Sequence, residues 1–249
     1  MVQEKTQINS IVLSTPPLPP KVVAQLASWH IHTVQDLMDM GVVKAFLLLK
    51  QAGLTLTFST LWSLESITTG IPVQQISIEK KNSLKNLVKQ ALPVAVFPEQ
   101  NTLEHYMKCA LEEAKKAFGI QEVPVGCIVV KDGQIIGSGF NHCMAKNSVM
   151  QHAELVAMTQ AMAFLNHCRL ENCDLYVTLE PCAMCAGAIL QARVKRVVFG
   201  AREPQMGAAG SVVNLFASSK LNTHTAILGG VLAQESQNLL QTFFQNRRE

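Results

Sequence analysis

The chain has 249 residues, 48% of them hydrophobic, and a formal net charge of only +3 at pH 7, so no global field attracts nucleic acid and a nucleic-acid partner would need a local basic patch. The start of the chain lacks the charged head and compact apolar run of a secretory signal, and no uncharged apolar stretch approaches the roughly 20 residues that cross a bilayer. Because the seven cysteines are scattered and odd in number, we expect reduced thiols and a soluble, cytoplasmic protein.

The first part of the chain has the pattern of several short helices. The second of them is the best defined, because Thr33 can cap its start, Asp36 falls at the third helical position and Gly41 follows its end. We predict a small all-α domain from this pattern. Its other helices are expected to begin at Pro19 or Pro20 and to cover residues 42–51 and 58–68.

The stretch ALPVAVFPEQN separates two regions of different composition. The region before it contains no arginine, whereas the region after it carries all six. Pro93 and Pro98 each disfavour helix in the residue before them. We therefore predict a helical domain with its tail and linker over residues 1–95 and a second domain over residues 96–249.

The second domain alternates between helical and extended patterns. An amphipathic helix ends at Gly119, and Asp132-Gly133 supplies the tight turn of a hairpin between two β-rich runs. Strands separated by helices predict an α/β fold in which helices cover a mixed sheet. The remaining predicted elements are helices over residues 152–166 and 183–192, strands over 173–179 and 196–200, and a final helix carrying Val231, Leu232, Leu239, Leu240, Phe243 and Phe244.

Three side chains have the pattern of a metal site. Cys182 and Cys185 follow a strand directly, and a pair spaced i, i+3 in a first helical turn shares one face, where the positive helix end favours thiolates. His152 supplies an imidazole. One histidine and two cysteines leave a tetrahedral zinc ion with an open position, which is the arrangement of catalytic sites.

Glu154 lies two residues after this histidine, also at the start of a helix. A carboxylate there can stand beside the metal without binding it and can move protons between a substrate and a water whose pKa zinc lowers to about 7. Three other interpretations stay open: a structural zinc closed by Cys168 or Cys173, a redox pair of cysteines, and an ordinary histidine at a helix start.

The order H-x-E followed by P-C-x-x-C is the signature of zinc-dependent nucleobase deaminases. The sequence around it carries, in order, EVPVGCIVV, GSGFN, QHAELVAM, LYVTLEPCAMCAGAILQARVKRVVFGARE and GAAGSVVNLF. From about residue 102 to 249 the chain thereby resembles the bacterial tRNA adenosine deaminases, which make inosine at the anticodon wobble position.

This resemblance implies a cytidine-deaminase-like fold and the hydrolytic deamination of adenosine in a tRNA anticodon loop by zinc-bound hydroxide. One zinc ion per subunit would be held by His152, Cys182 and Cys185, with Glu154 as the proton shuttle. The substrate would be an anticodon stem-loop with an extruded adenosine. A homodimer is also implied, with each pocket completed by the neighbouring subunit.

The resemblance also implies contacts to the RNA. Asn141 would hold the flipped base, and Glu203 would meet the nucleotides beside it. Cys143, Ser148, Val149 and Met150 depart from the family pattern in the loop before His152, which bears on contacts to flanking nucleotides. Other implied contacts are the backbone around Ala153, the Glu180-Pro181 turn, and Phe244, Arg247 and Arg248 of the final helix, although a core phenylalanine and a solvated basic end explain that helix equally well.

Residues 16–90, from LPPKVVAQLASWHIHTVQDL onward, resemble the C-terminal helical domain of TfoX-type competence regulators, with a helix-hairpin-helix look. Such hairpins can grip phosphates through backbone amides. Here Pro19 and His30 stand where glycines are usual, so we favour a packing role or docking of a protein partner over accessory tRNA binding. Trp29 and Trp62 are expected to anchor the core.

Two rival functions remain open. The same pocket chemistry would serve a deaminase of free bases or nucleosides. A protein with a structural zinc could instead bind RNA or a regulator without catalysis, and replacement of Glu154 separates this reading from both enzymes.

Overall fold

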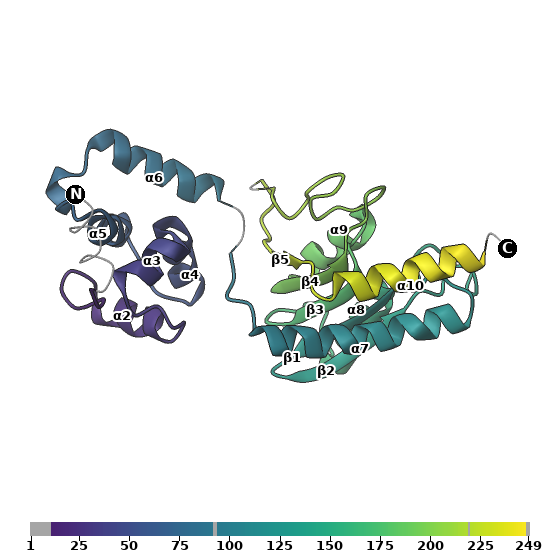
Figure 1. The fold of residues 1–249 in the computed structure, drawn as a ribbon. Helices are drawn as coiled ribbons and strands as arrows, with labels where there is room; N and C mark the ends of the chain where they lie inside the picture. Colours follow the sequence, from purple (N-terminus) through teal and green to yellow (C-terminus); the bar gives the residue numbers. More distant parts are fainter. Residues whose placement is uncertain (1–10, 92–93, 219, 248–249) are drawn as a thin grey trace. The chain divides into compact units, whose positions relative to one another are not determined.

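The computed structural model describes residues 11–91, 94–218 and 220–247 of the chain. Its contacts divide the chain into two compact units, Met1–Val96 and Phe97–Glu249, which are described separately below (Figure 1). The predicted roles of Pro93 and Arg248 fall outside the described residues. Within the described ranges, no helix is both long and apolar enough to cross a membrane.

The first unit consists of short helices, which confirms the predicted all-α domain. Helix α3 (Val34–Met40) starts as predicted: the Thr33 hydroxyl accepts a hydrogen bond from the Asp36 amide at 3.1 Å, and the Asp36 carboxylate accepts one from the Thr33 amide at 2.8 Å. Trp29 and Trp62 pack against a core made mainly of leucines. The other elements are α2 (Pro20–Ala27), α4 (Val42–Gln51), α5 (Phe58–Thr69), a 3-10 turn η1 (Val73–Gln75) and α6 (Ile78–Gln90).

Helix α6 is absent from the sequence-based expectations. Its side chains are mostly polar, and only Leu84 is buried, at 2% exposure, with Val88 packed beside it. The Ser77 hydroxyl caps the helix by accepting a hydrogen bond from the Lys80 amide at 3.1 Å. An apolar stripe this narrow gives little helical periodicity, because most of the helix faces away from the core.

The second unit contains a five-stranded mixed sheet in the order β2-β1-β3-β4-β5. β1 pairs antiparallel with both β2 and β3, and the last three strands are parallel. The hairpin turns where it was predicted, with positive φ at Asp132 and Gly133. The strands are β1 (Gly126–Lys131), β2 (Gln134–Phe140), β3 (Asp174–Leu179), β4 (Arg196–Ala201) and β5 (Ala226–Gly229).

Both faces of the sheet are covered by helices. Apolar side chains alternate between the two faces along β1, so both faces have to be buried. Cys127 and Val129 face one hydrophobic cluster, whereas Ile128 and Val130 face another. Helices α8 (Ala153–Leu165) and α9 (Ala183–Gln191) cover the first face, and α7 (Gln100–Gly119) and α10 (Ala233–Asn246) lie together over the second (Figure 1). The mixed α/β fold covered by helices is thereby confirmed.

The prediction for the end of the chain was wrong in its bounds. Helix α10 begins at Ala233, because Leu232 takes a left-handed conformation with φ 49° and ends any continuation from the preceding residues. Val231, expected in the helix, instead packs in the core below α7. The short strand β5 was not predicted, since four residues carry too little alternation to distinguish a strand from a loop.

A close approach of β2 to α8 sets the position of the helix that begins beside the metal-ligand residues. A Cβ added at Gly139 would lie 2.7 Å from the Ala153 carbonyl oxygen and 2.7 Å from the Ala157 amide nitrogen. We expect Gly139→Ala to push α8 outward, lower the free energy of unfolding by about 1–3 kcal/mol and weaken metal binding. Urea denaturation and metal titration measure both effects. Gly119→Ala is the control, because nothing lies within 4 Å of its added Cβ; equal losses in the two variants would contradict this interpretation.

Candidate active site and metal centre

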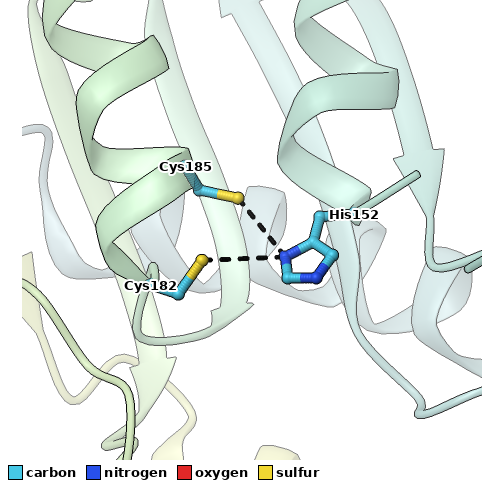
Figure 2. Close-up of side chains that lie close together, drawn as sticks. All are labelled: His152, Cys182 and Cys185. Carbon is cyan, nitrogen blue, oxygen red and sulfur yellow. Dashed lines mark hydrogen bonds between the residues drawn. The ribbon is translucent and has the colours of Figure 1, made fainter. Parts of the chain in front are cut away.

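The structure brings His152, Cys182 and Cys185 together at the starts of two neighbouring helices (Figure 2). His152 is the N-cap of α8, and Cys182 is the N-cap of α9 with Cys185 one turn further on. The His152 Nδ1 atom lies 3.7 Å from the Cys182 sulfur and 3.5 Å from the Cys185 sulfur. Both sulfurs therefore face the same ring nitrogen.

This donor triangle fits a tetrahedral zinc ion. Zinc–sulfur bonds of about 2.3 Å and zinc–nitrogen bonds of about 2.0–2.1 Å at a tetrahedral angle would separate the sulfur and nitrogen atoms by roughly 3.6 Å. The two observed separations bracket that value. Among the described residues, no fourth histidine, cysteine, aspartate or glutamate joins this group. Neither Cys168 nor Cys173 closes the site, so its geometry matches three protein ligands rather than four.

The electrostatics of the two cysteines favour a bound cation. The hydrogen bond from Cys185 lowers the pKa of Cys182 to about 4, so this thiol is ionised at neutral pH. The bond with Cys182, together with burial, raises the pKa of Cys185. The hydrogen bond to Cys182 also raises the pKa of His152. Negative charge thus lies on the Cys182 sulfur, at the α9 N-terminus, where free backbone amides add a positive field that favours a thiolate.

Glu154 stands beside this triad without belonging to it. It is the second residue of α8, is only 4% exposed, and is hydrogen-bonded to Cys185. Burial raises the pKa of its carboxyl group. A buried carboxyl group with a raised pKa, next to a metal-binding position, is suited to taking up and releasing a proton.

A cavity of about 370 Å³ opens at this point. That size lies within the range of small-molecule sites. Asn141 is on its wall, with the side-chain oxygen accepting a hydrogen bond from the Ala153 amide at 2.9 Å. The other predicted site residues on the wall are His152, Glu154, Glu180, Cys182, Glu203 and Arg247.

Three predicted substrate contacts are not on this wall. Ala153 is fully buried, and its amide is taken by Asn141. The Pro181 carbonyl accepts a hydrogen bond from the Ala208 amide at 2.8 Å. Phe244 is 46% exposed at the end of α10, with its ring against Phe243. Of the final helix, only Arg247 reaches the cavity among the described residues.

The Glu180 carboxylate organises the loop over residues 202–211. It accepts hydrogen bonds from the amides of Ala209 at 2.9 Å, Ser211 at 3.0 Å and Glu203 at 3.2 Å, and from the Ser211 hydroxyl. Burial alone would raise the pKa of this carboxyl group, but these hydrogen bonds outweigh it and hold the pKa below its usual value. Because the loop carries Glu203 and Met206 to the cavity wall, the bonds of the Glu180 carboxylate hold that part of the wall in place.

We expect Glu180→Gln to lower the free energy of unfolding by about 2–3 kcal/mol, because an amide NH₂ group would face donors that now bond to a charged oxygen. The loop would loosen, so KM for an RNA substrate would rise. Urea denaturation and steady-state kinetics measure the two effects. The control is Glu171→Gln, whose carboxylate pairs with Arg193 at the surface and is 56% exposed; similar changes in both variants would show that Glu180 has no organising role.

Sequence reasoning missed several residues of the cavity. Glu122 is 3% exposed and accepts a hydrogen bond from the Ala145 amide at 2.7 Å, which ties the loop after Asn141 to the entrance of β1. Cys143 and Met144 of that loop also line the cavity. Glu122 stands in the EVPVG motif, one of those that carry the family resemblance. Its hydrogen bond to the Ala145 amide joins residues far apart in the sequence, so the motif alone does not indicate it. Val149 and Met150, at 71% and 55% exposure, lie on the same loop.

Comparisons with known proteins agree with this geometry. Residues 100–201 match the family model of the cytidine and deoxycytidylate deaminase zinc-binding region. Residues 9–88 match the family model of the TfoX C-terminal domain. The two matches cover separate parts of the chain, one in each compact unit.

Individual relatives match the second unit. The tRNA-specific adenosine deaminase of Haemophilus influenzae is 46% identical over 147 residues, which make up 59% of this chain and 85% of that protein. A structure from studies of A-to-I editing by tRNA:A34 deaminases at the wobble position of transfer RNA shares 40% identity with a TM-score of 0.53 and covers 55% of this chain and 99% of its own. The guanine deaminase of Nitrosomonas europaea, at 22% identity and a TM-score of 0.51 over 64% of this chain and 90% of its own, shares the fold. The chain belongs to the family of tRNA-specific adenosine deaminases, with a TfoX-type helical domain in front of the deaminase unit.

Proposed function

We propose that this protein hydrolyses adenosine to inosine at the wobble position of a tRNA anticodon loop. The observation that carries the proposal is the set of three metal-ligand side chains with a buried carboxyl group beside them, of which His152, Cys182 and Glu154 line one cavity. Its sequence context is shared at 46% identity with a tRNA-specific adenosine deaminase.

His152, Cys182 and Cys185 would hold one zinc ion. When bound, zinc supplies a Lewis acid that lowers the pKa of water and makes a nucleophile available near neutral pH. Glu154 would accept one proton from the attacking water and deliver it to N1 of adenine. It would then take the remaining proton from the hydroxyl group added at C6 and pass it to the amino group, which leaves as ammonia. The reaction consumes one water and replaces the C6 amino group by oxygen.

Recognition of the base would fall to the remaining wall. The Asn141 amide is held by the Ala153 backbone and can donate its NH₂ group to an acceptor on the flipped base. Glu203 would contact the nucleotides beside the target. The loop bearing Cys143 and Met144 would contact them as well, so its departures from the family pattern would set sequence preference around the adenosine.

We also infer a homodimer and a cytoplasmic location. Met144 and Met206, 70% and 65% exposed beside the cavity, support a neighbouring subunit that completes the pocket. Sedimentation of the purified protein measures this, and a monomer would contradict it. The seven cysteines are all free thiols, as is usual in a reducing compartment.

The function is tested with zinc-loaded protein and an anticodon stem-loop that carries adenosine at the wobble position. We expect inosine, seen as guanosine on sequencing, and no product from a matched loop with the adenosine moved by one position. Free adenine, guanine, cytosine and adenosine serve as further substrates, with ammonia release as the readout. Ammonia from free bases without inosine in any loop would favour the free-base reading, and no product at all would favour a binding protein.

A further inference from the structure

Helix α6 carries a row of unpaired positive charge. Lys81, Lys85 and Lys89 follow one another at intervals of four residues, so they lie on the same side of the helix. Among the described residues of this unit, the only ion pair joins Lys80 and Glu65, at 3.0 Å. Lys80 lies on a different side of α6 from the three lysines. Like charges at this spacing weaken an isolated helix, so the row has a cost that no neighbouring carboxylate offsets.

We call these three side chains the lysine row. Below it lie two aromatic rings of α5: the Lys81 and Lys85 ammonium groups are 5.2 Å and 5.4 Å from the centroid of Trp62, and Lys85 is 5.5 Å from that of Phe58. Both rings are partly buried against the core. Cation–π contacts of this kind hold the ammonium groups in place over a rigid surface rather than leaving them free in solvent.

Two arginines of the deaminase unit have different surroundings. Arg193 pairs with Glu171 at 3.1 Å, and Arg196 forms an ion pair with Asp174. Cations that are already paired offer less to an external anion than unpaired ones do. The lysine row is therefore a local basic patch in a chain whose net charge is only +3.

We propose that the lysine row binds the sugar-phosphate backbone of the same tRNA that presents its anticodon loop to the deaminase unit. This inference rests on the proposed function. Phosphates complement the three ammonium groups, of which those of Lys81 and Lys85 are held over aromatic rings, and a contact through them needs no base sequence. Because the row is tethered to the unit that takes the RNA, even a weak phosphate contact gains from a high effective concentration. The helical unit thus adds affinity for tRNA as a class, in contrast to the packing or protein-docking role expected from sequence.

The test compares full-length wild type, Lys81→Gln/Lys85→Gln/Lys89→Gln and a control, Lys21→Gln/Lys44→Gln/Lys50→Gln. The control removes the same charge from exposed positions on α2 and α4 of the same unit. Dissociation constants for a whole tRNA with wobble adenosine are measured from 50 to 200 mM salt. We expect the row variant to bind roughly tenfold to hundredfold more weakly at 50 mM salt, with a slope of log K against log salt smaller by about 2 to 3. The control should change by less than about threefold.

Circular dichroism and the rate of deamination of an isolated stem-loop at saturation report on folding and on the intact deaminase unit, and both should match wild type. Equal tRNA binding by wild type and the row variant overturns the inference, as does an equal loss in the control. Selective loss of binding to polyglutamate, with tRNA binding unchanged, would show that the row serves an acidic protein and would also overturn it. If wild type makes no inosine yet tRNA binding depends on the row, the proposed function fails while the binding of tRNA phosphates by the lysine row stands.

Discussion

Glu154→Gln should reduce the turnover number for stem-loop deamination by about 10²–10⁴-fold while leaving bound zinc at one per chain. The size follows from the loss of general acid–base catalysis at one position. Glutamine fills the same space as glutamate but has no ionisable proton. Because its size is matched, the fold should persist even though the side chain is only 4% exposed. Single-turnover assays with inosine sequencing and elemental analysis of the same sample measure the two quantities.

A matched control is Glu235→Gln, since Glu235 also lies in the first turn of a helix in the same unit but is exposed. This variant should deaminate at the wild-type rate. If Glu154→Gln retained full activity, the proton would have to travel through another group and the proposed mechanism would be abandoned. If it lost zinc as well as activity, Glu154 would be a metal ligand instead.

Cys185→Ala should lower the affinity for zinc by roughly 10²–10³-fold and abolish deamination at ordinary zinc concentrations. Structural zinc sites bind with about 10–16 kcal/mol over four ligands, so one ligand contributes on the order of 3–4 kcal/mol. Competition with a chromogenic chelator gives the affinity. Removal of zinc from wild type with the same chelator should reproduce the loss of activity, and added zinc should restore it.

Cys173→Ala controls for the loss of a buried thiol. Cys185 and Cys173 are both fully buried. Cys173 belongs to the hydrophobic cluster under α8 and α9, contacts the Glu171 carbonyl and lies outside the ligand group. Its removal should cost some packing and no zinc. An equal loss of zinc in the two variants would mean that the metal depends on the core as a whole rather than on a sulfur ligand.

Much of the site could be predicted because its ligands are set by local rules. Cys182 and Cys185 are three residues apart at a helix start, and this spacing alone puts both sulfurs on one face. His152 is 30 residues from Cys182, and the sequence gives no distance between them. Their meeting depends on α8 and α9 covering the same face of the sheet, which the alternating pattern of helices and strands allows but does not determine.

The parts that could not be predicted depend on partners far along the chain. The bonds of the Glu180 carboxylate reach 23 to 31 residues onward, into a loop without regular structure. The sequence therefore predicted that the Glu180-Pro181 turn lines the pocket, but not that this carboxylate holds the loop. Glu122 was overlooked for the same reason, since Ala145 is 23 residues away. Helix α6 was missed because only a thin apolar stripe contacts the core, and β5 because it is too short to show a period.

The hydrogen bond between Asn141 and the Ala153 backbone has a consequence for how a base is selected. A backbone N–H can only donate, so it keeps the amide oxygen on its side and prevents the side chain from turning over. The wall consequently offers a donor whose orientation is settled before any RNA arrives, and no rotational entropy has to be lost on binding. A base with a hydrogen-bond acceptor opposite the Asn141 NH₂ group can accept a hydrogen bond from it. A base with an N–H group at that position would face a second donor, because the Asn141 side chain cannot turn to offer its oxygen.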